Sequence, residues 1–320
     1  MTSFICNICG AHNEVAVFQT EPASCACGSN VRLRALIHLL SMELFGQPVV
    51  LRDFPKLKGI RGLGISDQPR YAGILAEKFD YTNTFYDREP RFDVLESHPR
   101  LAESYDFILA ADVIEHIAPP IEFALEELCR LLKPHGFLGI TIFCNPADQM
   151  REHFPELHEF RVVPLGKSAV LINRRRDGTL EIRDDIVIHG GTGTTLEMRE
   201  FGIRDLQAKL LGAGFSDIHF LAENLPEIGI LFDDQVSQPL IARKKPFTMN
   251  TSVRSQMVDA WREAENRAWQ ERARADKLAA QVRQERERSD VLVSEIRMAS
   301  ESRWVRLGRR FGVGPKFRSE

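Results

Sequence analysis

Four cysteines with the spacing of metal ligands lie within the first 27 residues of this 320-residue sequence. They form two pairs, Cys6-x-x-Cys9 and Cys25-x-Cys27, and a glycine directly follows each pair. Such pairs form tight turns that point two thiolates at one tetrahedral ion. In a reducing cytoplasm this pattern predicts zinc rather than disulfides. Four sulfur ligands would close the site to substrate, so the zinc is expected to stabilise the fold.

A second group with chemical potential lies between two apolar runs. Tyr105 to Ala110 has the length of a buried strand, and the loop from Ala111 to Pro120 contains Asp112, Glu115 and His116. Apolar residues then recur at helical spacing up to Leu132, and a second apolar run covers residues 137–143. A strand, a helix and a strand with short connections predict a parallel pair in an α/β sheet.

This region resembles class I S-adenosylmethionine (SAM)-dependent methyltransferases in two motifs. They are the segment Asp112-Val113-Ile114-Glu115-His116 and the segment Leu132-Lys133-Pro134-His135-Gly136, in which His135 replaces a glycine. The resemblance covers about residues 57–245. It implies a Rossmann-like α/β fold, SAM as the cofactor and methyl transfer as the reaction.

The same resemblance implies the cofactor-binding residues. The first strand, 57–66, keeps only Gly62-Leu63-Gly64 of the usual glycine-rich pattern, and the next loop begins at Asp67. An acid after the second strand holds the ribose hydroxyls in this fold, and an acid after the third lies beside the adenine. The residues expected to bind SAM are therefore Gly62, Gly64, Asp67, Asp87, Asp93, Ala111 and Asp112.

Two histidines are candidate general bases, because the unperturbed pKa of histidine lies near neutrality. His116 follows the fourth strand, and His189 begins a loop rich in glycine and threonine. His158 and Arg199 are expected to contact the acceptor. Both belong to residues 145–200, an insertion on the substrate side in which a turn around Asp177-Gly178 predicts a hairpin.

Helices flank this core in the sequence. Residues 1–46 are expected to form the zinc-binding element and an amphipathic helix over 31–46. That helix carries Arg32 and Arg34, which could contact an anionic substrate or remain solvated. Residues 251–300 contain neither proline nor glycine and predict one long helix. Apolar residues at heptad spacing predict a coiled coil there, and hence a homo-oligomer.

The last segment, residues 301–320, mixes arginines with Trp304 and Phe311. Contact of residues 302–318 with an anionic membrane surface is one expectation. A disordered tail and a docking peptide for a partner protein are the alternatives. The segment also looks like the tails that follow coiled coils in bacterial surface-glycan enzymes.

The bulk composition is that of an ordinary globular protein. The formal net charge is −3, and the core has no basic stripe, so we expect no nucleic-acid partner. The N-terminus lacks the layout of a secretory signal, and no apolar run approaches the roughly 20 residues of a membrane span. These features predict a cytoplasmic protein, with contact at the inner membrane surface through the tail.

The expected function is transfer of a methyl group from SAM to a sugar hydroxyl of a bacterial glycan or glycan precursor. A nucleotide-sugar C-methyltransferase is an alternative, because those enzymes also combine an N-terminal zinc element with a methyltransferase fold. A third possibility is a non-enzymatic scaffold that keeps the fold and acts through its coiled coil.

Overall fold

The computed structural model describes residues 2–15, 24–145, 149–166, 168–189, 195–232 and 239–312. Contacts between Cα atoms divide the chain into two compact units, Met1–Met257 and Val258–Glu320.

A six-stranded mixed sheet forms the centre of the first unit, in the order β15-β16-β6-β5-β3-β4. The strands β3 (Leu57–Ile65), β4 (Phe79–Thr84), β5 (Tyr105–Ala111) and β6 (Leu132–Thr141) are parallel to one another. The strand β16 (Leu240–Arg243) is antiparallel to both β6 and the edge strand β15 (Asp217–Phe220). This mixed sheet confirms the predicted α/β class.

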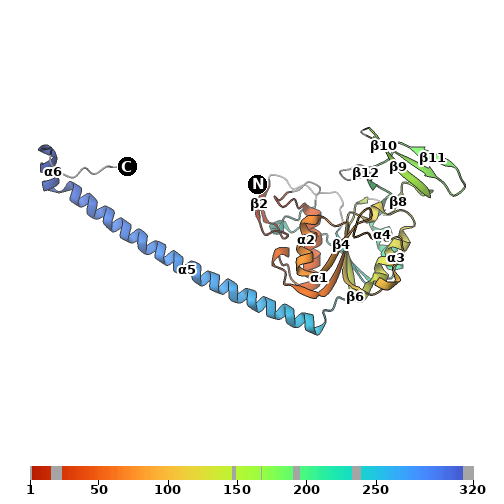
Figure 1. Ribbon diagram of the computed structural model, residues 1–320, viewed down its shortest axis with the longest axis horizontal. Coiled ribbons are helices and arrows are strands. Elements are labelled where there is room, and N and C mark those ends of the chain that lie inside the picture. Colours follow the sequence, from red (N-terminus) through yellow and green to blue (C-terminus); the bar gives the residue numbers. More distant parts are fainter. Residues whose placement is uncertain are drawn as a thin grey trace. The chain divides into compact units, whose positions relative to one another are not determined.

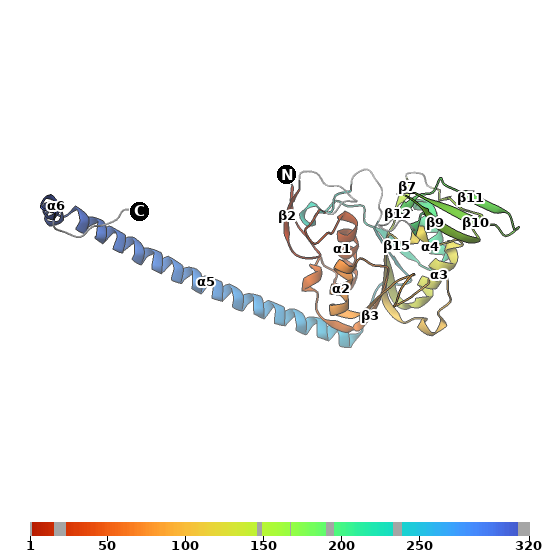
Figure 2. The ribbon, with the colours of Figure 1, turned by 45° about the horizontal axis from the view of Figure 1, so that its top comes forward.

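Helices cover both faces of the sheet (Figures 1 and 2). On one face, α1 (Val31–Phe45) and α2 (Pro69–Lys78) share a core with Phe107 of β5. On the other face, α3 (Ile121–Leu131) and α4 (Ile203–Gly212) share a second core with Ile108. Because both faces are covered, β5 is a nearly continuous apolar run, as expected for a buried parallel strand.

The helix α1 begins and ends at residues suited to caps. Asn30 is the N-cap, and its side chain accepts a hydrogen bond from Leu33 N. Gly46 ends the helix in the left-handed conformation, with φ at 69°. The predicted apolar face is buried, and Arg34 and Ser41 are buried as well. The cysteine-bearing N-terminal element and the sheet therefore share one hydrophobic core.

The third strand that the resemblance implies around Asp93 does not form at residues 91–94. Phe85 and Arg91 form only an isolated bridge, and a turn follows in which Leu95 N donates to Asp93 Oδ1. This side-chain hydrogen bond offers the backbone an alternative to a strand ladder. Residues 229–232 also stay outside the sheet, since Leu225 and Ile230 form another isolated bridge.

Three smaller sheets follow β6 within residues 144–202. One contains β7 (Cys144–Asn145), β14 (Arg199–Gly202) and β8 (Arg151–Glu152), in that order. A second contains β9 (Glu159–Leu165), β10 (Ser168–Arg174) and β11 (Leu180–Arg183), which confirms the predicted hairpin around Asp177-Gly178. The third pairs β12 (Ile188–His189) with β13 (Thr195–Leu196).

The remaining elements are short or helical. An N-terminal hairpin pairs β1 (Thr2–Ile5) with β2 (His12–Val15). Within the described residues, four 3₁₀ turns cover Leu51–Asp53, Pro99–Leu101, Ile114–His116 and Pro226–Ile228.

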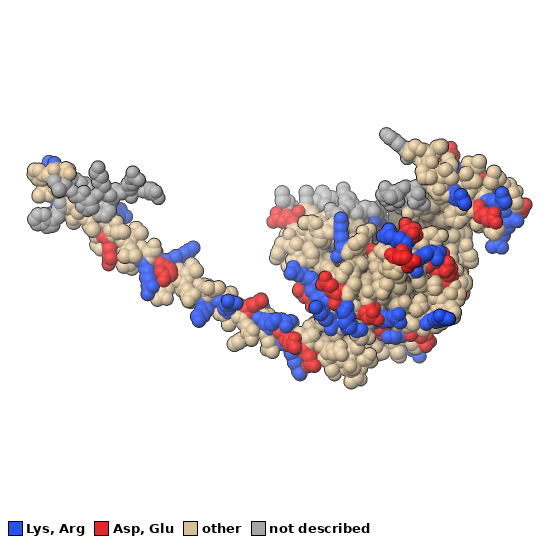
Figure 3. Space-filling view, viewed as in Figure 1, with Lys and Arg blue, Asp and Glu red and all other residues tan. Residues whose placement is uncertain are grey.

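The predicted long helix is present as α5 (Thr251–Glu301), followed by α6 (Arg303–Arg310). Val253, near the start of α5, is buried in the core of the first unit. From Val258 onward the helix belongs to the second unit. Its visible face carries both signs of charge interspersed along its length (Figure 3). Among the described helices, none combines the length and apolarity needed to cross a membrane.

Candidate functional site

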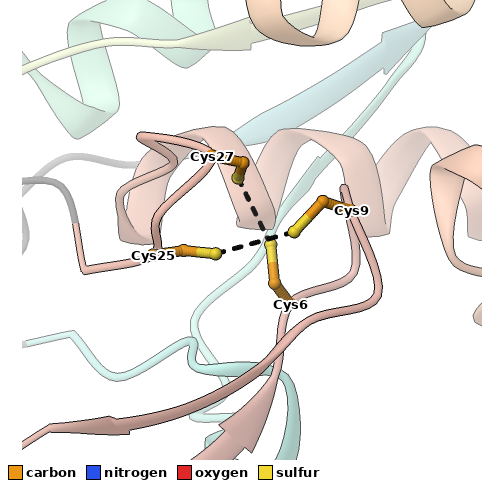
Figure 4. A group of neighbouring side chains, drawn as sticks. All are labelled: Cys6, Cys9, Cys25 and Cys27. Atoms are coloured by element: carbon orange, nitrogen blue, oxygen red, sulfur yellow. Dashed lines mark hydrogen bonds between the residues drawn. The ribbon is translucent and has the colours of Figure 1, made fainter.

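The four N-terminal cysteines converge on one point (Figure 4). Cys6 and Cys9 come from the turn after β1, and Cys25 and Cys27 from the turn before α1. The sulfur atoms of Cys6 and Cys27 are 3.8 Å apart, and those of Cys9 and Cys25 are 3.6 Å apart. Tetrahedral zinc, with Zn–S distances of about 2.3 Å, requires sulfur atoms roughly 3.8 Å apart. The donor set and its spacing therefore fit a structural zinc ion.

Arg34 lies beside this cysteine cluster. Its guanidinium donates to Ser29 O at 3.0 Å and to Gly229 O at 2.6 Å, and Ser29 Oγ lies 3.3 Å from Cys6 Sγ. The idea that Arg34 is solvated or binds substrate is wrong, because the side chain is fully buried. Its positive charge compensates the thiolates that a metal would require.

The cysteine element also reaches the carboxyl edge of the sheet. Arg32, two residues before Arg34 on α1, places Nη2 3.3 Å from Asp112 Oδ2. Arg70, at the start of α2, donates from Nη1 to Gly28 O at 2.7 Å. Gly28 has a φ of 79°, and a Cβ there would lie 1.5 Å from Arg70 Nη1. The cysteine turn is thus connected to the loops that follow β3 and β5.

Asp112 occupies the predicted position immediately after β5. Its φ of 55° turns the chain sharply out of the strand. Its backbone N donates to Thr141 O at 3.0 Å, and Thr141 Oγ1 donates to Asp112 Oδ1 at 2.8 Å. The carboxylate is therefore held between the end of β6 and Arg32.

Glu115 is a functional candidate from the loop after β5 that is not among the residues expected to bind SAM or to act as the base. Its side chain is buried, and burial, reinforced by the charge of Asp112, raises the pKa of this carboxyl group from 4.5 to about 8. The raised pKa favours the protonated form of Glu115 at neutral pH, and Oε2 is a buried atom without a hydrogen-bond partner among the described residues.

His116 is held by the backbone of the insertion. Nδ1 lies 3.0 Å from Leu196 O. Since a carbonyl oxygen only accepts, Nδ1 carries the hydrogen, and Nε2 of the neutral ring is the basic nitrogen. The backbone of Met198 donates to Glu115 O at 2.9 Å. Segment 196–198 therefore positions the whole loop after β5.

Asp67 lies at the same edge but is fully enclosed. Tyr71 and Tyr81 donate their hydroxyl hydrogens to its two carboxylate oxygens at 2.6 and 2.5 Å. Burial raises the pKa of Asp67 to about 6, while the tyrosines and the backbone of Ala111 act in the opposite direction. The hydrogen bonds of Asp67 thus connect the ends of β3, β4 and β5.

Gly62 and Gly64 make room for aromatic side chains. A Cβ at Gly62 would lie 2.3 Å from the Phe107 ring, and one at Gly64 would lie 2.0 Å from the Tyr81 hydroxyl oxygen. Both distances are far below van der Waals contact. In this structure the two glycines allow the close packing of β3 against its neighbours.

Asp87 and Asp93 lie in the loops after β4. Asp87 is exposed, with Oδ1 3.8 Å from Arg88 Nη1. Asp93 is mostly buried, lies 3.6 Å from Arg91 and accepts from Leu95 N. Asp87 therefore remains accessible to a ligand, whereas local partners hold Asp93.

Arg199 and His158 lie in the insertion. The Arg199 guanidinium pairs with Glu152 at 2.7 Å and donates to Ile117 O at 2.6 Å. Arg199 is buried and binds the backbone of the loop after β5. This position differs from the contact with the acceptor that the sequence predicts. The backbone N of His158 donates to Asn173 Oδ1. The side chain of His189 lies outside the described residues.

One segment of the chain matches a known protein family. Residues 83–140 match a family model described as a methyltransferase domain. The segment runs from β4 to β6 and includes Asp87, Asp93, Asp112, Glu115 and His116. This part of the chain is therefore similar to a methyltransferase domain. No curated protein matches the sequence.

Several solved structures are similar at low identity. One is the CMeT domain of the citrinin polyketide synthase, at 13% identity and a TM-score of 0.36, covering 58% of this chain and 46% of that chain. Another is the 1,6-didemethyltoxoflavin-N1-methyltransferase of Burkholderia thailandensis with S-adenosylhomocysteine. Its sequence identity is 15% and its TM-score is 0.34, and the match covers 65% of this chain and 76% of that chain. A third is a SAM-dependent methyltransferase from Clostridium acetobutylicum, with 10% sequence identity and a TM-score of 0.35. The match covers 64% of this chain and 96% of that chain.

Proposed function

We propose that this protein transfers a methyl group from SAM to a hydroxyl group of a sugar in a glycan or glycan precursor. The observation that carries the proposal is the group formed by Asp112, Glu115 and His116. It lies at the carboxyl ends of parallel strands, within the segment that matches a methyltransferase domain. Ligands of open α/β sheets bind at this edge.

The residues at this edge fit the cofactor. Asp87 would accept hydrogen bonds from the ribose hydroxyls, because its carboxylate is exposed beyond β4. The protonated Glu115, with Oε2 lacking a partner among the described residues, would donate to a ligand atom beside Asp112. When bound, SAM supplies a methyl group that its sulfonium already activates for transfer.

His116 is the proposed general base. Its Nδ1–H is held by Leu196 O, so Nε2 would take the proton of the acceptor hydroxyl as the oxygen attacks. Arg199 keeps the loop in place by donating to Ile114 O and Ile117 O. The main contribution of the protein would be alignment of the acceptor oxygen with the methyl group.

The structural zinc ion is part of the proposal. The ligands would be Cys6, Cys9, Cys25 and Cys27. The bound ion would order the cysteine element, and through the contacts of Arg32 and Arg70 it would also order the loops after β5 and β3. The sugar acceptor is supported by the resemblance of the tail to those of surface-glycan enzymes. Homo-oligomerisation through 251–300 and membrane contact through 302–318 belong to the same proposal.

Calorimetric titration of the zinc-loaded protein with SAM and with S-adenosylhomocysteine tests the cofactor. We expect binding of both, and a loss of at least tenfold in Asp87→Ala. Asp80→Ala is the matched control, because Asp80 is an exposed acid at the opposite end of β4, near Arg61. Absence of binding in the wild type would favour the scaffold, and equal binding in both variants would remove Asp87 from the site.

A screen of acceptors tests the second half of the proposal. Oligosaccharides and glycan precursors should yield a methyl ether in the presence of SAM. Methylation on carbon of a keto-sugar nucleotide would establish the alternative C-methyltransferase instead. His116→Ala should lower kcat by about 10²- to 10⁴-fold if this residue is the base, with SAM affinity unchanged.

A further inference from the structure

Three side chains of the insertion form a cluster that the proposed reaction does not use. His153 follows β8, Glu197 precedes β14, and Glu200 belongs to β14. His153 Nε2 lies 3.1 Å from Glu197 Oε1 and 3.9 Å from Glu200 Oε1. One imidazole nitrogen and two carboxylate oxygens thus lie within 4.8 Å of one another.

The backbone fixes the positions of these donors. The pairing of β14 with β8 sets Arg199 opposite Glu152 and Glu200 opposite Arg151. His153 N donates to Met198 O at 2.9 Å, and Arg183 Nη1 donates to His153 O at 3.2 Å. The three side chains are also partly enclosed, with exposed fractions of 15% for His153, 12% for Glu197 and 29% for Glu200. The backbone that carries the three side chains is therefore fixed before any ligand arrives.

Spacing and charge both suit a metal ion. Around an ion with ligand distances of about 2.1 Å, adjacent ligand atoms lie roughly 3.0 to 3.4 Å apart. The distance from His153 to Glu197 falls in this range, and a small rotation of Glu200 would bring it there. Two carboxylates held this close repel each other. A divalent cation would neutralise both charges.

We propose that His153, Glu197 and Glu200 bind a divalent cation and leave positions open for other oxygen ligands. One imidazole and two carboxylates suit Mn²⁺, Fe²⁺ or Zn²⁺. Segment 196–198 connects this site to the loop after β5 by two hydrogen bonds. Leu196 O accepts one from His116 Nδ1, and Met198 N donates the other to Glu115 O. In the proposed reaction, the open positions on the cation would take oxygen atoms of the acceptor. That role rests on the proposed function, whereas the binding of the metal does not.

Titration of the full-length, zinc-loaded protein with Mn²⁺ tests the site, with free Mn²⁺ measured by electron paramagnetic resonance. Thiolates prefer softer ions, so Mn²⁺ does not report on the cysteine cluster. We expect one bound Mn²⁺ per chain that Zn²⁺ displaces. Glu197→Gln should weaken binding at least tenfold, and Glu200→Gln, at the most exposed of the three ligands, should do the same. Glu159→Gln is the control, because Glu159 is an exposed acid on β9.

Circular dichroism identifies a variant that fails to fold, and the other glutamine variant then decides the result. The proposal is overturned if the wild type binds no Mn²⁺ or if both folded glutamine variants bind it as tightly as the wild type. In that case the cluster is an ion pair of His153 with the two glutamates. SAM calorimetry without Mn²⁺ separates the two proposals, because binding of SAM does not require this cation.

Discussion

Glu115 carries a carboxyl group whose chemistry depends on its surroundings rather than on its type. The charges that act on it come from Asp112 on the same loop, Arg32 on α1 and Glu197 of the insertion, and it in turn affects Cys144. Burial is the largest effect, because a charged carboxylate loses its hydration there. Glu115 and the neighbouring His116 therefore offer an acid and a base on adjacent residues.

The raised pKa of Glu115 predicts a pH dependence of stability. In the folded protein this group keeps its proton up to about pH 8, whereas in the unfolded chain it loses the proton near its ordinary pKa of 4.5. The folded state then binds the additional proton between these values, so stability falls as the pH rises. From about pH 6 to pH 8 the fall in unfolding free energy due to Glu115 should be roughly 2 kcal/mol.

Urea unfolding at several pH values measures this effect. Glu115→Gln stays neutral at every pH and should lack this part of the slope. Glu126→Gln, at an exposed position on α3, should keep the slope of the wild type. An identical slope in the wild type and Glu115→Gln would show that the carboxyl group is ionised in the folded protein.

At the scale of elements, α1 connects the cysteine cluster to the carboxyl edge of the sheet. Arg34 faces the cysteine turn, and Arg32 faces Asp112, from positions two residues apart on the same helix. Most of the helix surface is buried in the core shared with β3 and β5. Because a rigid helix links the two sites, disorder at one is expected to disturb the other.

Loss of the metal should therefore affect both stability and cofactor binding. Cys25→Ser should remove zinc from the purified protein and lower the unfolding free energy by more than about 3 kcal/mol. This corresponds to a decrease of at least about 6 °C in Tm. SAM affinity, measured by calorimetry below the new Tm, should fall as well. Cys129→Ser alters a buried cysteine of α3 outside the cluster and should keep its zinc. Full zinc content in Cys25→Ser would contradict the assignment.

At the scale of the whole molecule, α5 presents apolar side chains to solvent along the second unit. Leu278, Val282, Leu292 and Ile296 are all exposed and fit the a and d positions of one heptad frame. Glu271, Glu285 and Ser289 occupy other positions of the same seam. A second copy of the helix would cover the apolar positions, and the polar ones would limit the strength of the pairing.

Sedimentation equilibrium of the full chain tests this pairing. Leu292→Glu, at a d position, should raise the dissociation constant of the oligomer at least tenfold. Val291→Glu is a closely matched control, because Val291 is also 57% exposed but lies one residue off the seam. A monomeric wild type, or equal weakening by the two substitutions, would contradict a coiled coil in this register.

The sequence by itself determined the features that depend on local spacing. The strand–helix–strand unit from Tyr105 to Thr141, the hairpin at Asp177-Gly178 and the two cysteine pairs each follow from residues close together in the chain. Periodicity and turn chemistry act over a few residues, so the strand–helix–strand unit and the hairpin were confirmed and each cysteine pair lies in a turn, whereas the zinc ion stays a prediction. The third strand that the resemblance implies does not form for a local reason, the side-chain turn at Asp93.

Only the tertiary structure decided which distant residues meet. Arg32 lies beside Asp112 because α1 packs on the sheet, and Arg199 is buried because it pairs with Glu152 on a neighbouring strand. The burial of Glu115 and the meeting of His153 with Glu197 depend on the same long-range packing. Burial and charge neighbours, not residue type or spacing, set the pKa of an acid and the role of an arginine, and they exist only after the chain has folded.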